Sequence, residues 1–276
     1  MWATPIKHRI LILGASGFIG NALYKELCPY YNTYGTYKTA NTSYASNQHF
    51  YQYDVETDDV FEILNQVKPT FIISALRGNF HAQILAHTHL IQYVQANGCK
   101  LLFLSSANVF YSYSKYPSYE TDKTFSQSIY GHFKIKIENM LLRLPKHQAI
   151  IVRLPMVFGQ MSPRLQAIKT LLKDKEPIEV FPNLILNIGI DTKLTQQIHF
   201  IINQNKTGIF HLGSTDLVHH DAFIKDILQK LAQPKALIKN VFTTNNDRYL
   251  AVLPKYNLLP THLQFESNDF LTKIEV

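Results

Sequence analysis

The N-terminal part of the chain joins an apolar strand, a glycine-rich turn and a helix. Arg9–Leu13 predicts a buried strand, and Asn21–Cys28 predicts a helix that ends before Pro29. Between them, glycines allow a tight turn and a close approach of backbone N–H groups, while the helix N-terminus stabilises negative charge. A plain turn is the alternative, but the strand directly before the glycines favours a loop that binds the pyrophosphate of a dinucleotide. The expected cofactor-binding residues of this loop are Gly14, Ser16, Gly17, Phe18, Ile19 and Gly20.

Strand-like and helix-like segments continue to alternate after this loop. Apolar strands are expected at residues 33–37, 50–53, 70–74, 100–104 and 149–154, and helices at 58–65, 80–97 and 129–143. This alternation predicts an α/β fold with a Rossmann-type doubly wound parallel sheet. Past residue 155 the elements become shorter, with helices at 163–173, 191–202 and 220–231 and strands at 178–181 and 208–212.

Two further features indicate proton-transfer chemistry. Tyr130 and Lys134 are four residues apart in a predicted helix and therefore share one face, where an ammonium can lower the pKa of a phenol. Ser105 and Ser106 follow the apolar strand at 100–104, and ligand-binding groups gather at the carboxyl ends of parallel strands. Each feature alone is weak, because Tyr-x-x-x-Lys is common on helix surfaces and Ser-Ser at a strand end is more often a turn or a cap. Their order after the glycine loop favours the functional interpretation.

The combination resembles the extended short-chain dehydrogenase/reductases of the NAD-dependent epimerase/dehydratase superfamily. It is most similar there to the sugar nucleotide-binding branch that holds dTDP-4-dehydrorhamnose reductase and the regulatory beta subunit of methionine adenosyltransferase. Asp54, Tyr119-Glu120 and Arg153–Gly159 are further matches, so the resemblance covers nearly the whole chain. It implies that the catalytic residues are Ser106, Tyr130 and Lys134, and that Lys134 also binds the ribose of the nicotinamide half.

The resemblance also implies a division of the chain. Residues 1–154 are expected to form an NAD(P)-binding Rossmann domain. Residues 155–276 are expected to form a small C-terminal substrate-binding lobe that partly returns to the sheet.

The choice of cofactor depends on the end of the second strand, where a carboxylate would favour NAD over NADP. No acid is present there, and Lys38 aligns with a basic position that pairs with the 2′-phosphate of NADP in relatives; a solvated surface lysine is the alternative. NADP(H) is therefore expected, with NAD(H) as the second choice. Asp54 is expected either to contact the edge of the adenine or to act as a cap. The backbone of Ser74, Ala75 and Leu76 is expected to lie beside the nicotinamide ribose.

Candidate substrate residues are fewer. A guanidinium can clamp a phosphate, which makes Arg77 and Arg164 candidates, although each is equally well explained as a solvated surface arginine. Asn108 and Met156 complete the candidate set. Ser106 is followed by Ala107-Asn108 instead of the Asp-Glu pair of the family's dehydratases, which disfavours dehydration. The Pro155-Met156 pair resembles the regulatory relatives, and the Asn that epimerases often carry at the Met156 position is missing.

These observations predict an NADP(H)-dependent oxidoreductase that reduces a keto group on a nucleotide-linked sugar, with Tyr130 as general acid/base. Two alternatives stay open. One is a sugar-nucleotide epimerase with tightly held NAD, and the other is a non-catalytic nucleotide-binding regulatory protein.

Composition limits which kinds of binding partner are expected. The formal net charge is +7, but the basic residues are scattered and form no run of five or more, so nucleic acid is not expected. No apolar run reaches the ~20 residues of a membrane span and no signal segment is recognisable, so we expect a cytoplasmic protein without a membrane partner. A homodimer is an open option. Cys28 and Cys99 are expected to be buried free thiols, and the histidines to be solvent-facing or capping residues without a metal.

Overall fold

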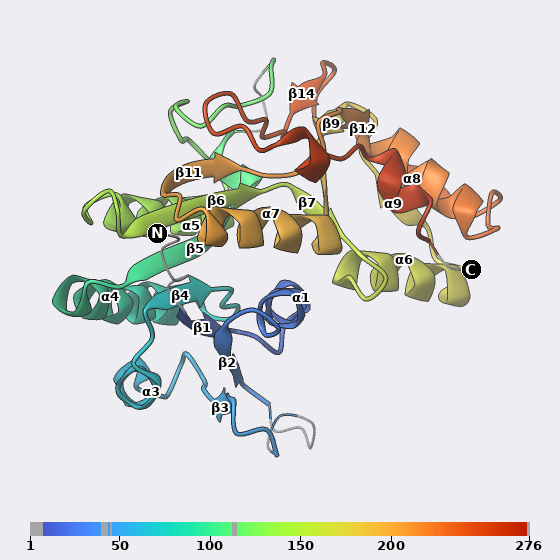
Figure 1. The fold of residues 1–276 in the computed structure, drawn as a ribbon. Coiled ribbons are helices and arrows are strands. Elements are labelled where there is room, and N and C mark those ends of the chain that lie inside the picture. The colour runs from blue at the N-terminus through green and yellow to red at the C-terminus, as the bar shows by residue number, and fades with distance from the viewer. Residues whose placement is uncertain (1–7, 40–43, 45, 112–114, 275–276) are drawn as a thin grey trace. The chain divides into compact units, whose positions relative to one another are not determined.

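The computed structural model describes residues 8–39, 44, 46–111 and 115–274. Its largest element is a seven-stranded sheet with the strand order β11-β6-β5-β4-β1-β2-β3 (Figure 1). Its strands are β1 (Arg9–Leu13), β2 (Asn32–Tyr37), β3 (Phe50–Gln52), β4 (Phe71–Ser74), β5 (Lys100–Ser106), β6 (Ala149–Leu154) and β11 (Gly208–His211). The pairs β2–β3, β1–β2, β1–β4 and β4–β5 are parallel. The predicted Rossmann-type α/β fold is confirmed.

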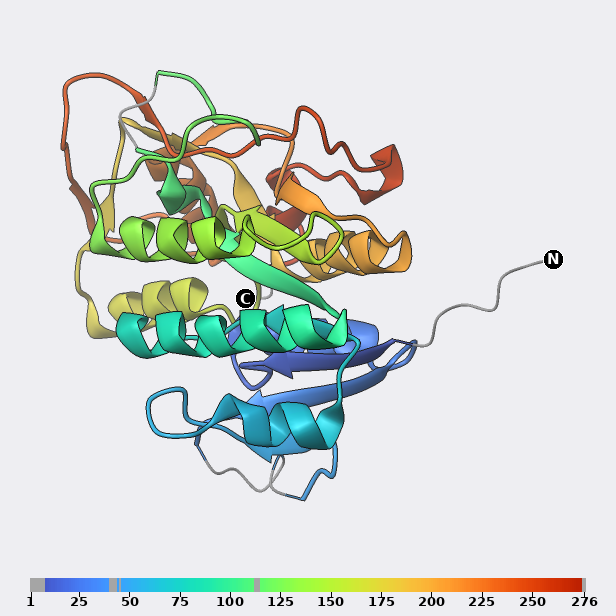
Figure 2. The ribbon, with the colours of Figure 1, turned by 90° about the vertical axis from the view of Figure 1, so that its left-hand side faces the viewer.

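Helices cover both faces of the N-terminal strands. Helix α1 (Phe18–Leu27) lies on one face, and α3 (Val60–Val67) and α4 (Phe80–Asn97) lie on the other (Figures 1 and 2). Strands between two helical layers must be apolar throughout, and residues 10–13 of β1 are all fully buried. Helix α1 starts earlier than the sequence predicted, because Gly17 in the glycine turn is already its N-cap.

The ends of α3 and α4 follow from local sequence. Asp59 caps α3 by accepting a hydrogen bond from the Phe61 N–H, and Asn79 caps α4 through the N–H groups of His81 and Ala82. Gly98 ends α4 in the left-handed conformation, with a φ of 67°.

The chain divides into two compact units, which we describe separately. Unit 1 comprises the described part of Met1–Ser105 with Phe133–Val152 and Ile198–Gly208. Unit 2 comprises the described part of Ser106–His132, Arg153–Gln197 and Ile209–Val276. Helix α5 (Ile129–Leu141) passes from unit 2 into unit 1, and α7 (Asp191–Asn203) does the same.

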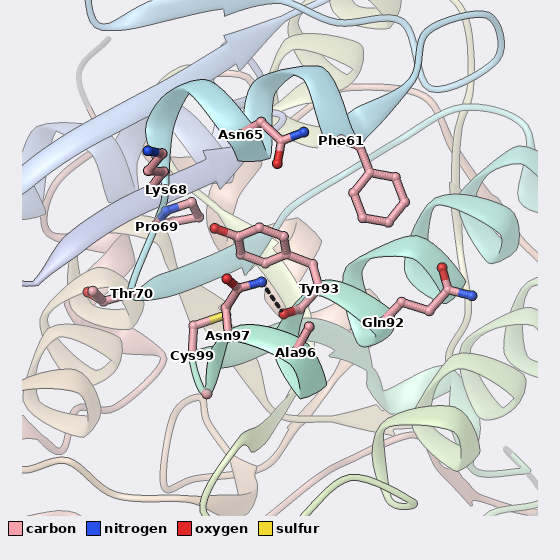
Figure 3. A pocket seen from close by; sticks show the side chains of 11 residues that line it. Phe61, Asn65, Lys68, Pro69, Thr70, Gln92, Tyr93, Ala96, Asn97 and Cys99 are labelled. Carbon is pink, nitrogen blue, oxygen red and sulfur yellow. Dashed lines mark hydrogen bonds between the residues drawn. The ribbon is translucent and has the colours of Figure 1, made fainter.

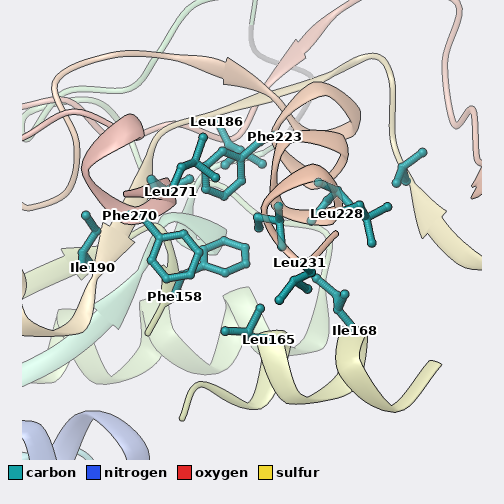
Figure 4. Close-up of a cluster of buried hydrophobic side chains, with 14 of the residues drawn as sticks. Phe158, Leu165, Ile168, Leu186, Ile190, Phe223, Leu228, Leu231, Phe270 and Leu271 are labelled. Carbon is teal, nitrogen blue, oxygen red and sulfur yellow. The ribbon is translucent and has the colours of Figure 1, made fainter. Parts of the chain in front are cut away.

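Unit 2 contains three small sheets, whose strands are β7 (Met156–Phe158) with β10 (Ile188–Ile190), β9 (Leu184–Leu186) with β12 (Val218–His219) and β14 (Arg248–Tyr249), and β8 (Ile178–Val180) with β13 (Ile238–Asn240). The pairs β7–β10 and β8–β13 are parallel. The helices α6 (Pro163–Asp174), α8 (His220–Lys230) and α9 (Asn268–Leu271) pack around one apolar cluster (Figure 4). Phe158, Phe223 and Phe270 lie at its centre, with ring centroids 5.2 to 6.3 Å apart.

Four predictions about single residues were wrong. Cys28 is exposed, while Cys99 is buried as expected. His87, His211 and His220 are buried, not solvent-facing. In the part of the chain that the structure describes, no helix is long and apolar enough to cross a membrane.

Candidate functional site

The glycine turn adopts a conformation that requires glycine. Gly14 has a φ of +83°, and a Cβ added there would lie 2.7 Å from the carbonyl oxygen of Ala75. A Cβ on Gly20 would collide with the Gly14 carbonyl. Thr36 of β2 supports the turn, because its hydroxyl accepts a hydrogen bond from the Gly14 N–H at 2.8 Å and its carbonyl accepts one from the Ser16 N–H at 3.1 Å.

The turn leaves the N-terminus of α1 open to a ligand. The N-cap residue Gly17 has extended backbone angles and, as a glycine, offers no side chain to cap the helix. The first turn of the ten-residue helix carries no acidic residue. Unsatisfied backbone N–H groups with the positive end of the helix dipole favour an anion here. Of the six loop residues predicted from the sequence, Gly14, Ser16 and Gly17 lie in the turn, and the other three form the first turn of α1.

At the far ends of β2 and β3, Lys38 is paired with two carboxylates. Its Nζ lies 3.0 Å from Asp54 Oδ2 and 3.2 Å from Glu56 Oε1. The hydrogen bonds to Asp54 and Glu56 raise the pKa of Lys38, and the Glu56 N–H and Lys38 lower the pKa of Asp54. Lys38 is thus an exposed lysine that is ion-paired to two carboxylates, and its role toward a 2′-phosphate stays a prediction.

The end of β4 lies beside the glycine turn. Ala75 donates its N–H to the Leu13 carbonyl, and its own carbonyl faces Gly14. Ser74 is buried and its hydroxyl is 2.9 Å from His87 Nε2, while His87 Nδ1 is 2.6 Å from the Gln83 carbonyl. Burial lowers the pKa of His87 to about 4, so it is neutral at physiological pH. Leu76 is half-buried, and Arg77 is exposed.

Lys134 is 6% exposed and donates a hydrogen bond to the Leu104 carbonyl at 2.8 Å. Its Nζ also lies 4.5 Å from the centroid of the Phe103 ring. Burial lowers the pKa of Lys134 to about 7, although the charge of Glu138 opposes this shift. Glu138 is itself buried and accepts a 2.5 Å hydrogen bond from Ser105.

Ser106 and the start of α5 form a second group, in unit 2. The Ser106 hydroxyl oxygen accepts two hydrogen bonds from Asn108, at 3.2 Å from its backbone N–H and at 3.0 Å from its Nδ2. A Cβ on Gly131 would collide with the Asn108 carbonyl and the Ser126 hydroxyl, so α5 begins directly against the turn that holds Ser106. Tyr130, the neighbour of Gly131, is 39% exposed. The structure thus brings the Ser106 turn and the Tyr130 turn together.

Arg164 lies within electrostatic range of Tyr130. Its side chain is exposed, yet the protein around its head group lowers its pKa, and the Tyr130 phenol opposes this. Burial lowers the pKa of His220 to about 4, and the Arg164 guanidinium adds to the shift. Met156 is partly buried on β7 and packs against the apolar cluster of unit 2.

One polar cluster had no role in the sequence interpretation. The Glu120 carboxylate is buried and accepts hydrogen bonds from the backbone N–H groups of residues 255–257. Burial alone would raise the pKa of Glu120, but these donors outweigh it and lower the pKa. Arg153 is also buried and hydrogen-bonds to the Glu120 carbonyl and His211. This cluster holds the segment 253–257 by hydrogen bonds.

A separate hollow of about 580 Å³ lies between α3 and α4 (Figure 3). Its lining includes Phe61, Tyr93, Lys68 and Cys99, and it contains none of the predicted site residues. Among the described residues, no group of three or more His, Cys, Asp or Glu side chains is arranged to hold a metal.

Residues 8–264 match the family model described as RmlD substrate binding domain. The chain belongs to this family. Solved structures of other proteins share this fold. A dTDP-4-dehydrorhamnose reductase from Bacillus anthracis in complex with NADP is 19% identical, with a TM-score of 0.77 over 97% of this chain and 98% of that one. A dTDP-glucose 4,6-dehydratase from the same organism in complex with NAD is 16% identical, with a TM-score of 0.78 over 95% of both chains.

A curated relative of this RmlD-type chain is the methionine adenosyltransferase 2 subunit beta of Bos taurus, which is 23% identical over 177 residues. The match covers 61% of this chain and 52% of the relative, so the chain spans about half the length of the curated relatives it matches. At these identities the likeness to solved structures shows the fold alone, and the function has to be argued from the site.

Proposed function

We propose that this chain is an NADP(H)-dependent oxidoreductase that reduces a keto group on a nucleotide-linked sugar. The observation that carries the proposal is the geometry at Ser106. Because Asn108 donates two hydrogen bonds to its oxygen, the Ser106 hydroxyl proton is left to donate to an oxygen of the substrate. The family membership and the relative in complex with NADP support the same proposal.

The residues of unit 1 fit a dinucleotide. The open N-terminus of α1 and the glycine turn would hold its pyrophosphate, and Lys38 with Asp54 would meet the adenosine half. Ala75 and Leu76 would border the nicotinamide ribose. As part of this proposal we keep the division into a dinucleotide-binding domain up to residue 154 and a substrate-binding lobe after it, with the catalytic residues in the first.

When bound, the reduced nicotinamide supplies the hydride. The residues of this chain do the rest. Ser106 holds the carbonyl oxygen by its hydroxyl proton, and Tyr130 gives its phenolic proton to that oxygen as the alcohol forms. Lys134 lies one turn further along α5. Its protonated ammonium stabilises the Tyr130 phenolate and binds the ribose hydroxyls. Asn108 keeps the Ser106 hydroxyl oriented as a donor, so we assign it a positioning role.

A second candidate is a non-catalytic regulatory protein. The methionine adenosyltransferase 2 subunit beta relatives and the Pro155-Met156 pair favour it. The intact set of Ser106, Tyr130 and Lys134 favours the reductase, because a regulator has no need of a proton donor.

The proposal is tested by NADPH oxidation with keto sugars linked to dTDP, UDP, GDP and CDP. We expect one of them to be reduced, and Tyr130→Phe to lower its kcat by about 10²–10⁴-fold, the usual contribution of general acid–base catalysis. The NADPH affinity of Tyr130→Phe should be nearly unchanged, and this measurement controls for correct folding of the variant. NADPH binding without oxidation by any of the four classes would favour the regulator, and an undiminished kcat in Tyr130→Phe would contradict the mechanism.

A further inference from the structure

We propose that Glu56 sets the discrimination between NADPH and NADH by competing with the 2′-phosphate for Lys38. The inference rests on the proposed function, because it assumes that the glycine turn binds a dinucleotide. It adds a residue that had no assigned role, and it predicts that discrimination is held below what Lys38 alone would give.

The geometry places Lys38 between two carboxylates. Lys38 follows β2, and its Nζ lies 3.0 Å from Asp54 Oδ2 and 3.2 Å from Glu56 Oε1. The three side chains are 57%, 27% and 43% exposed, so a ligand phosphate arriving at Lys38 can reach the same ammonium. The charge of the group is one cation and two anions, a net −1, where a single lysine would present +1.

The two carboxylates differ in how they are held. Asp54 is fixed by the chain, because its Oδ1 accepts the Glu56 N–H at 3.1 Å and the loop turns back on its carbonyl. Among the described residues, the Glu56 side chain forms a hydrogen bond and an ion pair with Lys38 alone. Glu56 can therefore be changed without removing an anchor of the loop, and it is the carboxylate that a phosphate would displace.

The expected consequence concerns only the phosphate. A 2′-phosphate has to take a hydrogen-bond donor from Glu56 and also meets its negative charge, whereas the ribose hydroxyls of NADH do neither. Exposed ion pairs are weak and are screened by salt, so removing the Glu56 charge should strengthen phosphate binding by about two- to five-fold at low ionic strength.

The experiment measures binding, not turnover. Calorimetry compares 2′,5′-ADP with 5′-AMP on the wild type, Glu56→Gln, Lys38→Met and the double variant Glu56→Gln/Lys38→Met. Glu62→Gln removes the same charge from the exposed surface of α3 and is the matched control. We expect Glu56→Gln alone to bind 2′,5′-ADP about two- to five-fold more tightly, with 5′-AMP unchanged and with the gain absent in the Lys38→Met background. The gain should shrink as NaCl is raised.

The outcomes separate the two ideas. If the wild type prefers 2′,5′-ADP through Lys38 but Glu56→Gln changes nothing, the role of Glu56 is refuted and the proposed function stands. An equal gain in Glu62→Gln, or in the double variant, would show a general charge effect and would also refute competition for Lys38. If neither probe nor NADPH binds to any variant, the proposed function fails together with the inference.

Discussion

At the scale of single residues, the sequence predicts which groups would carry the chemistry but not how they are held. Tyr130, Lys134 and Ser106 were predicted from spacing and strand position. The two hydrogen bonds from Asn108 to Ser106 were not, because they depend on the short turn after β5. His87 was predicted to face solvent, yet Gln83, His87, Leu90 and Val94 form the buried stripe of α4. Their spacing of three and four residues was the signal that would have predicted its burial.

Lys134 gives a prediction about pH. Its pKa is about 7 in the folded protein and well above that in the unfolded chain, because burial disfavours the charged form. Between these two values the unfolded chain binds more protons, so this group makes the free energy of unfolding rise with pH, by up to about 1.4 kcal/mol per pH unit. Below pH 7 both states are protonated, and the full penalty of the buried charge is present.

Lys134→Met keeps most of the apolar stem and removes the charge. We expect it to raise the free energy of unfolding at pH 7 and to flatten its rise between pH 7 and pH 9.5 relative to the wild type. Urea unfolding at several pH values measures both slopes. Other groups titrate alike in the two proteins, so parallel curves would show that the Lys134 pKa is not lowered.

At the scale of elements, α5 is the helix on which the proposed chemistry depends, since it carries Tyr130 and Lys134 one turn apart. Its extent was predicted to within two residues, because an apolar periodic segment of this length has a strong signal. Its start is set by the close approach of Gly131 to the Asn108 carbonyl and Ser126. Such a contact leaves no periodic pattern in the sequence. Among the small strands of unit 2, β8 was predicted at residues 178–181, whereas the others were missed, since two or three residues carry no alternation.

Gly131→Ala tests that contact. An exposed helical glycine normally becomes more stable as alanine, by up to about 1 kcal/mol. Here the added Cβ collides with backbone, and overpacking of this kind costs about 1–3 kcal/mol. We therefore expect lower stability in urea and a reduced kcat, because the Tyr130 turn is pushed away from the Ser106 turn. A variant as stable and as active as the wild type would show that the contact does not position α5.

At the scale of the whole molecule, the alternation of strands and helices was enough to predict a doubly wound parallel sheet, but not that β11 is its seventh strand. The predicted border at residue 154 is a statement about function, and it stays a prediction. The structure adds that the compact units are interleaved, since residues 106–132 belong with the C-terminal part and residues 198–208 with the N-terminal part. Contacts between segments so far apart in sequence leave no local pattern, so a single sequence does not reveal them.

Binding of a nucleotide is read out by the whole molecule as a shift in its melting temperature. Arg164 lies in the first turn of α6 within electrostatic range of Tyr130, which suits a diphosphate held beside the reacting group. In the presence of NADP we expect one of UDP, dTDP, GDP and CDP to stabilise the wild type, by about 2.7 kcal/mol at 100 times its dissociation constant. Arg164→Ala should lose most of this shift, whereas Lys173→Ala, which removes the same charge from the last turn of α6, should keep it. The nucleotide-sugar assignment fails if none of the four shifts the wild-type melt. The role of Arg164 fails if its variant responds as Lys173→Ala does, because the diphosphate would then be bound by other residues.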